Sequence, residues 1–414
     1  MDDERADALL EGGDDKPGGG GAPWYRSRRA FVLGAAGLTA VAVALGLGLT
    51  VASDGPAQPA PDRFEPLPVV VATWFPSATQ RAYDRLAAGF TALDAVELGC
   101  TLCEDEQCDG TVGYGGSPDE SGETTLDALI MDGETHRVGA VTYLRRIRHA
   151  IAAARLVMAH TQHTVLSGDG ATNFSVQMGL PLQDLHTNES LWIQGNFTKN
   201  DCQPNYWQAP FNTSGCGPFT PVPTPSYTPA YTPVPVVHAD GRAGHAVQRA
   251  PSAPRAPPQR SVRHGAGPRE HDTVGMCALD LGGRMAAGGS SNGATHKIPG
   301  RVSDISLVGA GSYVDRDAGC AGATGDGDVT MRFLPAYQAV EFMRGGMHPQ
   351  AACENAVRRI MAYFGADFHL GLVCMDRLGR IGAAGQGWTF TYAIASGANA
   401  TARVVAVPPL PVNS

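Results

Sequence analysis

The sequence predicts a mixed α and β fold in which helices cover sheets, and three observations lead to this prediction. Hydrophobic residues make up 43% of the 414 residues and charged residues 17%, which provides a sizeable core and excludes a disordered chain. Strand-like and helix-like segments follow one another in blocks, without the regular alternation of a doubly wound sheet. A proline-rich segment, residues 217–268, separates two such blocks and holds 12 of the 30 prolines.

Charge and glycine pattern exclude two other classes of protein. The net charge of −9 and the pI near 5.7 argue against nucleic-acid binding as the main role. The 52 glycines do not recur at every third position, which excludes a collagen.

The N-terminal region predicts a membrane segment. Residues 1–29 are polar and end in arginines, whereas residues 30–53 carry no charge. An apolar helix of about 20 residues crosses a bilayer, so we expect an uncleaved signal anchor at 30–53 and a stalk at 54–66. The arginines before the run predict a cytosolic N-terminus and a luminal or external remainder. A cleaved signal peptide is the alternative, although its apolar region usually has about 7 to 15 residues.

Sequons and cysteines agree with passage through the secretory pathway. Five N-x-S/T sequences follow the apolar run, at Asn173, Asn188, Asn196, Asn212 and Asn399. The nine cysteines are odd in number, so at least one thiol stays unpaired. Cys100, Cys103 and Cys108 have a metal-like spacing, but no fourth ligand lies nearby and an oxidising lumen favours a local disulfide. No metal site is expected.

The residue patterns predict elements on both sides of the proline-rich segment, which we expect to be an exposed linker. Before it we expect a strand at 69–74, a helix that Ser77 caps and that ends near Leu86, a helix at 92–100 and the strongest helix at 143–160. After it we expect strands at 273–279 and 284–288, helices at 328–344 and 350–364, and strands at 369–375, 379–384 and 388–395. His160 and His163 have no further ligand beside them and are interpreted as ordinary helix-end histidines.

Two motifs carry little chemistry. Residues 289–293, GSSNG, match a nucleophile elbow with Ser291 at its centre, but Pro299 and Gly300 follow where a helix is required. The glycine-rich stretches match neither a phosphate-binding loop nor a dinucleotide fingerprint, so no cofactor is expected.

The junction between Asp272 and Thr273 predicts more. A flexible linker ends there and a strand begins. If this peptide bond were cut, Thr273 would carry a hydroxyl nucleophile beside a free α-amine that serves as its base. Spacing alone does not separate this hypothesis from a structural threonine at the start of a strand.

Several blocks closely resemble the glycosylasparaginase family of N-terminal nucleophile hydrolases. They include HDTVGMCALD, RMAAGGSSNG, KIPGRVSD, GATGDGD and VGYGGSPDESGETTLDALIMDG, and the resemblance runs from about Val69 to Ala395 without the linker. It implies an αββα sandwich and self-cleavage before Thr273 into an α-chain part, 67–272, and a β-chain part, 273–414. It also implies hydrolysis of the amide between GlcNAc and asparagine without a cofactor, a dimer of αβ units, and a lysosomal or vacuolar lumen.

The resemblance assigns roles by position. Thr273 would be the nucleophile, Thr324 and Gly325 the oxyanion hole, Arg301 and Asp304 the groups that hold the substrate's α-carboxylate and α-amine, with Ser291, Gly327 and Trp74 also at the site. It implies disulfides Cys103–Cys108, Cys202–Cys216 and Cys353–Cys374, with Cys100, Cys277 and Cys320 free. Ser291 stands where the family has threonine, and TWFP where it usually has TWPF.

Two other functions stay open. An isoaspartyl peptidase or L-asparaginase would share the fold. A catalytically inactive, membrane-tethered binding protein would show damage at the nucleophile or the oxyanion hole, and the residues just assigned are all present.

Overall fold

The computed structural model describes residues 64–207, 216, 234–237, 243–246 and 273–412. The predicted membrane run at 30–53, most of the stalk, Asn212 and Asp272 lie outside these residues. Within the described ranges, no helix has the length and apolar character that a membrane crossing requires. The described segments before and after the linker belong to one compact unit.

An eight-stranded sheet combines strands from both sides of the linker, in the order β14-β13-β1-β7-β8-β2-β3-β4. Its strands are β1 Val69–Thr73, β2 Leu126–Asp132, β3 Val138–Leu144, β4 Val165–Ser167, β7 Val274–Leu279, β8 Met285–Ser291, β13 Phe390–Ser396 and β14 Asn399–Val407. The β-branched run of β1 is fully buried, as a central strand requires, and lies antiparallel between β7 and β13. The two segments therefore complete one sheet together.

A four-stranded antiparallel sheet packs on the first. Its order is β12-β11-β10-β9, with β9 Ser312–Asp315, β10 Gly319–Gly325, β11 Leu370–Asp376 and β12 Ile381–Gln386. Buried side chains of both sheets, including Val71, Cys277, Cys320 and Val373, form the core between them. Small residues dominate β8 and β10, so the two sheets approach closely there.

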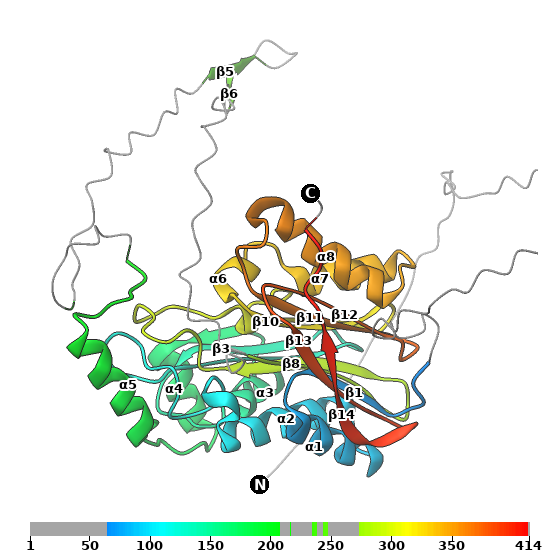
Figure 1. Ribbon diagram of the computed structural model, residues 1–414, viewed down its shortest axis with the longest axis horizontal. Helices are drawn as coiled ribbons and strands as arrows, with labels where there is room; N and C mark the ends of the chain where they lie inside the picture. The colour runs from blue at the N-terminus through cyan, green and yellow to red at the C-terminus, as the bar shows by residue number, and fades with distance from the viewer. Residues whose placement is uncertain (1–63, 208–215, 217–233, 238–242, 247–272, 413–414) are drawn as a thin grey trace, which may run out of the picture. The chain divides into compact units, whose positions relative to one another are not determined.

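Helices cover the outer faces of both sheets (Figure 1). The helices are α1 Pro76–Ala87, α2 Ala92–Glu106, α3 Ala150–His160, α4 Gly168–Gln177, α5 Asn188–Lys199, α6 Gly327–Thr330, α7 Pro335–Arg344 and α8 Pro349–Phe364, with short 3-10 turns at Cys108–Gly110 and Asp304–Ser306. One apolar cluster joins α1, α2 and α3 to the large sheet, and another joins α7 and α8 to the small one. The layers follow the order helix, sheet, sheet, helix, which fits the expected sandwich.

Two predicted helices before the linker were wrong in their bounds. The run at 143–160 is helical only from Ala150, because β3 continues to Leu144 and both Tyr143 and Arg146 have positive φ. Leu144 and Ile147 are still buried, so the apolar pattern was real but served a strand and a turn. The helix expected at 92–100 continues to Glu106.

Backbone geometry explains the two remaining corrections. Ser77 does not cap α1, because the left-handed Phe75 precedes Pro76 and the Ser77 hydroxyl donates to Glu106 instead. The helix expected at 328–344 is divided into α6 and α7, because Leu334 is left-handed and Pro335 follows it. The linker contains one described hairpin, β5 Val234–Val237 with β6 Ala243–Ala246.

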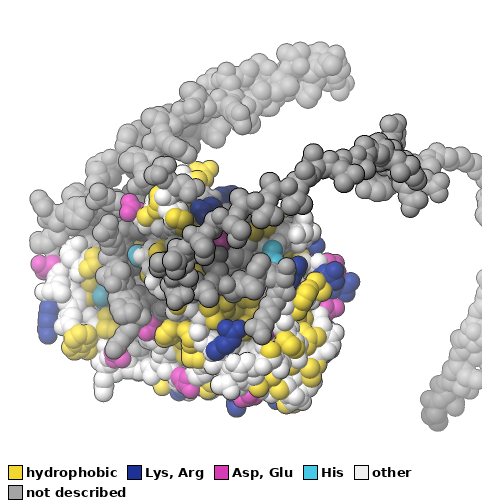
Figure 2. Space-filling model, turned by 45° about the vertical axis from the view of Figure 1, so that its right-hand side comes forward, with side chains coloured by type: hydrophobic (Ala, Val, Ile, Leu, Met, Phe, Trp, Pro, Cys, Tyr) yellow, Lys and Arg dark blue, Asp and Glu magenta, His cyan; other side chains and the backbone are white. Residues whose placement is uncertain are grey.

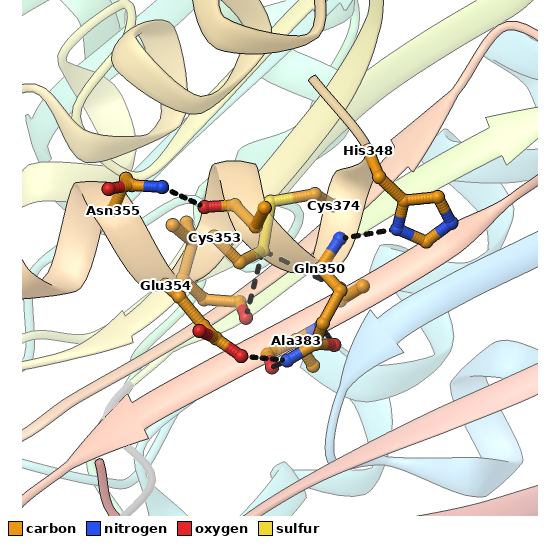
Figure 3. The surroundings of a disulfide bond; sticks show 10 residues. His348, Gln350, Cys353, Glu354, Asn355, Cys374 and Ala383 are labelled. Carbon is orange, nitrogen blue, oxygen red and sulfur yellow. Dashed lines mark hydrogen bonds between the residues drawn. A yellow bond between two sulfur atoms is a disulfide. The ribbon is translucent and has the colours of Figure 1, made fainter. Parts of the chain in front are cut away.

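The structure pairs the cysteines that the resemblance pairs. The bridges are Cys103–Cys108, Cys202–Cys216 and Cys353–Cys374, and Cys100, Cys277 and Cys320 are free and buried. The bridge from Cys353 fastens α8 to β11 of the small sheet (Figure 3). Beside it, the Gln350 amide donates to Glu354 and to the backbone oxygen of Ala383 on β12, which ties α8 to the same sheet.

The molecular surface carries charges of both signs. On the visible part of one face, Lys and Arg side chains lie near Asp and Glu side chains, with hydrophobic side chains among them (Figure 2). Three of the expected glycosylation sites, Asn173, Asn188 and Asn399, are exposed, and Asn196 is half-buried.

Candidate active site

Thr273 is buried at the start of β7, where a side chain from β1 holds the backbone on both sides of its carbonyl. The Thr73 hydroxyl donates to the carbonyl oxygen of Thr273 at 2.9 Å and accepts from the amide of Gly275 at 2.9 Å. Regular pairing of β1 with β7 ends one step earlier, at Ala72 and Met276. Thr73 therefore extends the ladder with its side chain and orients the first residues of β7.

The two sheets meet most closely beside this point. A Cβ on Gly275 would lie 3.0 Å from both the backbone nitrogen and the oxygen of Ala323 on β10. Two residues farther along β7, the thiols of Cys277 and Cys320 are hydrogen-bonded. The two strands thus run in opposite directions past each other, and the next residues along this line are Thr273 on β7 and Thr324 on β10.

Thr324 and Gly325 combine a buried hydroxyl with a backbone conformation that requires glycine. The Thr324 hydroxyl is buried and has no hydrogen-bond partner among the described residues. Gly325 has φ +124°, and a Cβ there would lie 2.4 Å from the backbone oxygen of His369. Only glycine fits this conformation and this approach. A buried hydroxyl without a partner is costly unless a ligand supplies one.

Ser291, the last residue of β8, lies next to the start of β7. The neighbouring Ser290 pairs with Val274, so Ser291 continues the same end of the sheet as Thr273. The Ser291 hydroxyl accepts from the amide of Gly293 at 2.9 Å. β8 is followed by a loop and the 3-10 turn at Asp304–Ser306, whereas a nucleophile elbow at Ser291 would need a helix directly after the strand.

Arg301, Asp304 and Gly327 come together at one place. A Cβ on Gly327 would lie 2.8 Å from both Arg301 Nη2 and Asp304 Oδ1, so glycine lets the chain pass against these groups. Arg301 donates through Nε and Nη2 to Asp328 Oδ2 at 3.2 and 3.0 Å. A Cβ on Gly293 would lie 2.9 Å from Arg301 Nη1, which links this cluster to Ser291.

Burial sets the charge of Asp304. Its carboxyl is 1% exposed, and Oδ2 has no hydrogen-bond partner among the described residues. Burial raises the pKa of Asp304 to about 7, although Arg301 opposes the shift. The pKa of Arg301 is also raised, because Asp328 and Asp127 outweigh its burial. The cluster thus presents a permanent cation beside a carboxyl that titrates near neutrality.

Trp74 directly follows Thr73 and lies at the same end of the sheet. Its amide donates to the backbone oxygen of Thr391 at 3.1 Å, and its side chain is half-buried. Trp74 and Phe75 both have left-handed φ, 49° and 40°. Two such residues in succession are unusual and cluster at functional sites. In the sequence TWFP, Trp74 and Phe75 therefore form a sharp turn between β1 and α1.

Known proteins resemble the chain over most of its length. The sequence model of the asparaginase family matches residues 65–405. This chain belongs to that family. It is 47% identical over 322 residues to rat N(4)-(beta-N-acetylglucosaminyl)-L-asparaginase, covering 77% of this chain and 84% of the rat protein, and equally similar to the mouse protein of that name. A probable isoaspartyl peptidase/L-asparaginase 3 of Arabidopsis thaliana is 43% identical over 329 residues, 79% of this chain and 87% of its own length.

This asparaginase-family chain has a buried lysine that sequence reasoning did not single out. Lys297 is fully buried and donates to the backbone oxygens of Asn292 and, at 3.4 Å, Ser117. Burial lowers the pKa of Lys297 to about 8, with Asp127 acting in the opposite direction. Lys297 begins the block KIPGRVSD, four residues before Arg301, and this position could have marked it as a site residue. Thr73 could have been found in a similar way, because its hydroxyl directly precedes Trp74 in the sequence.

The remaining expected residues lie elsewhere. His160 and His163 are exposed, and no group of three or more His, Cys, Asp or Glu side chains within the described ranges has the arrangement of a metal site. Cys103 and Cys108 form a disulfide.

Proposed function

We propose that this asparaginase-family chain is a glycosylasparaginase, which hydrolyses the amide between GlcNAc and asparagine after a cut before Thr273. One observation carries the proposal. Thr273 directly precedes β7 near the place where Gly275 lies against Ala323 of β10, and the next residue of β10, Thr324, has a buried hydroxyl without a partner among the described residues. Similarity to the rat and mouse enzymes supports the choice of substrate.

In the proposed reaction, the Thr273 hydroxyl attacks the side-chain amide carbon of the substrate. The free α-amine of Thr273 takes the hydroxyl proton and delivers it to the departing nitrogen of the sugar amine. Water then cleaves the aspartyl ester, which releases aspartate and restores the threonine. Thr324 and the amide of Gly325 stabilise the tetrahedral oxyanion in both steps.

The charged cluster accounts for a substrate with a free amino-acid end. Arg301 pairs with the α-carboxylate, and the ionised form of Asp304 pairs with the α-ammonium. Gly327 leaves room against both groups. Trp74, at the same end of the sheet as Thr73, lines the site.

Self-cleavage makes the active enzyme in this proposal. The Thr273 hydroxyl attacks the carbonyl carbon of Asp272, the amide becomes an ester, and water completes the cut. The α-chain part then ends at Asp272 and the β-chain part begins at Thr273. Both parts remain in one sheet because β1 stays paired with β7 and β13.

Cell location and assembly belong to the same proposal. Residues 30–53 anchor the chain as a single-pass type II protein, with the hydrolase in the lumen of a lysosome or vacuole, and two αβ units form a dimer. Alkaline carbonate extraction, protease protection and light scattering of the purified luminal part test these three points. Release by carbonate would refute the anchor.

The second candidate, an isoaspartyl peptidase or L-asparaginase, is kept because of the Arabidopsis relative. GlcNAc-asparagine and a β-aspartyl dipeptide, assayed side by side, separate the two functions. Preference for the dipeptide would favour the second candidate.

N-terminal sequencing and intact mass provide the deciding experiment. We expect two polypeptides, the smaller beginning TVGMCALD, and a Thr273→Ala protein that stays a single inactive chain. Thr330→Ala, another buried threonine, serves as the control and should be cut normally. An active protein with Thr273 still inside one chain would overturn the proposal, as would the absence of any hydrolysis by cut protein.

A further inference from the structure

A buried carboxyl outside the proposed reaction lies behind the end of β8. Glu104 is on α2, fully buried, within the apolar cluster that contains Cys100, Cys103 and Ile151. Its Oε1 accepts from the Ser290 hydroxyl at 2.6 Å and from the backbone amide of Ile151 at 2.9 Å. Its Oε2 is buried without a hydrogen-bond partner among the described residues. Burying a carboxyl in apolar surroundings costs folding free energy unless its hydrogen bonds compensate. The hydrogen bonds of Glu104 are therefore expected to have a role.

The contact between Glu104 and Ser290 is adjacent to the proposed site, because Ser290 precedes Ser291 in β8. Neighbouring residues of a strand point to opposite faces, so Ser290 faces α2 while Ser291 faces away from it. Ser290 is paired with Val274, the residue after Thr273. A shift at Ser290 would therefore move both Ser291 and the start of β7.

The segment after Glu104 also contacts the residue that follows β8. The Asn292 side-chain amide donates to the backbone oxygens of Gly110 and Gly113 at 3.1 and 3.0 Å. Gly113 also lies against the backbone of Glu104, where a Cβ would come within 2.2 Å of its carbonyl oxygen. Residues 104–113 thus hold Ser290 and Asn292, and Ser291 stands between them.

We propose that Glu104 is a positioning residue of the hydrolase site, whose carboxyl fixes Ser290 and thereby aligns Ser291 with Thr273. The inference rests on the proposed function, because it assigns Glu104 to the alignment of that same site. Glu104 does not contact substrate. It acts through the last pair of residues between β7 and β8, so its loss should affect turnover and self-cleavage more than substrate binding.

Variants of Glu104 and Ser290 test the inference in the full chain. Glu104→Ala should slow self-cleavage and lower kcat by about tenfold, with KM changed by less than about twofold, since the charged substrate contacts are untouched. Glu104→Gln keeps the Oε1 acceptor and should restore most of both rates. Ser290→Ala removes the partner hydroxyl, and combined with Glu104→Ala it should add little further loss. Glu106→Ala, two residues along α2 and exposed, is the matched control.

The outcomes separate this inference from the proposed function. Hydrolysis and self-cleavage by Glu104→Ala at the rates of Glu106→Ala would overturn the inference while the function stands. If Glu104→Ala fails to fold, Ser290→Ala decides, and its normal kcat and cleavage rate would overturn the inference. A wild-type protein that is cut but hydrolyses no glycoasparagine refutes the function, and self-cleavage rates then remain the readout for Glu104.

Discussion

The Thr73 hydroxyl bridges the carbonyl oxygen of Thr273 and the amide of Gly275, at 2.9 Å each, across two strands that lie on opposite sides of the linker. A strand before the linker thereby fixes the backbone of the proposed nucleophile, which follows the linker. The carbonyl of Thr273 is held one step beyond the last regular pair of β1 and β7, Ala72 and Met276.

Replacing Thr73 with valine should therefore misalign Thr273. The valine keeps the shape but leaves the Thr273 carbonyl and the Gly275 amide unpaired in a buried place, which costs about 1 to 3 kcal/mol. We expect kcat to fall about tenfold or more and self-cleavage to slow. Thr79→Val is the control, because Thr79 is equally buried and its hydroxyl donates to the oxygen of Phe75 at the N-cap of α1. Equal kinetics for the two variants would refute the role of Thr73.

Thr324→Ala should slow turnover by about a hundredfold or more, because removing one oxyanion donor costs about 3 to 4 kcal/mol. Its hydroxyl has no described partner in the free protein, so the substitution should leave the free energy of unfolding nearly unchanged. Steady-state kinetics and chemical denaturation measure the two effects. Loss of stability without loss of kcat would assign Thr324 to folding rather than catalysis.

Asp304 should make substrate capture dependent on pH. Its pKa of about 7 lies far above the ordinary value of 3.8, so the free enzyme carries a protonated Asp304 below neutrality. The protonated form cannot pair with the substrate's ammonium, and kcat/KM should fall as the pH decreases from about 8 to about 5. Asp304→Asn should have a low kcat/KM with a flatter profile, whereas Asp317→Asn, at an exposed carboxyl, should keep the wild-type profile.

The same shift has the opposite sign for stability. Because folding raises the pKa of Asp304, protonation is favoured in the folded state, and this contribution is lost as the pH rises from about 4 to about 7. Thermal melts should show a smaller decline over this interval for Asp304→Asn than for the wild type. If the melting temperature declined equally with pH in the two proteins, the ionisation of Asp304 would have no effect on stability.

The Cys353–Cys374 bridge should stabilise the layer formed by α8 and the small sheet (Figure 3). Replacing both cysteines with alanine should lower the free energy of unfolding by about 2 to 4 kcal/mol, as expected for a native disulfide. Cys100→Ala, at a free buried thiol, controls for lost packing. Peptide mapping without reductant should find Cys353 linked to Cys374, and a link from either residue to another cysteine would contradict the assignment.

The local sequence pattern was sufficient to predict several central strands of the large sheet. The β-branched run of β1 and the apolar hairpin of β7 and β8 were predicted close to their bounds, because a fully buried strand needs such residues at every position. The junction at Thr273 was visible as a threonine that starts a strand after the linker, whereas Arg301 and Asp304 were assigned only through the resemblance to the glycosylasparaginase family.

The helix at 143–160 shows where local pattern failed. Its apolar spacing is real, but positive φ at Tyr143 and Arg146 divides it between a strand, a turn and a shorter helix. Side-chain periodicity reports which residues are buried and does not report backbone breaks that packing imposes.

The sequence by itself determined the mixed fold class, because that depends on residue type and short spacing. Through contiguous blocks that resemble a known family, it also supplied the candidates for the nucleophile and for the charged substrate pair. Only the tertiary structure decided what holds them together. Thr73 reaches Thr273, Glu104 reaches Ser290 and Ala323 approaches Gly275 across separations that no periodicity records. Thr73 and Glu104 contact residues that follow the linker, and Gly275 and Ala323 lie on different sheets. Such contacts form only when the chain folds and packing excludes water around these polar groups.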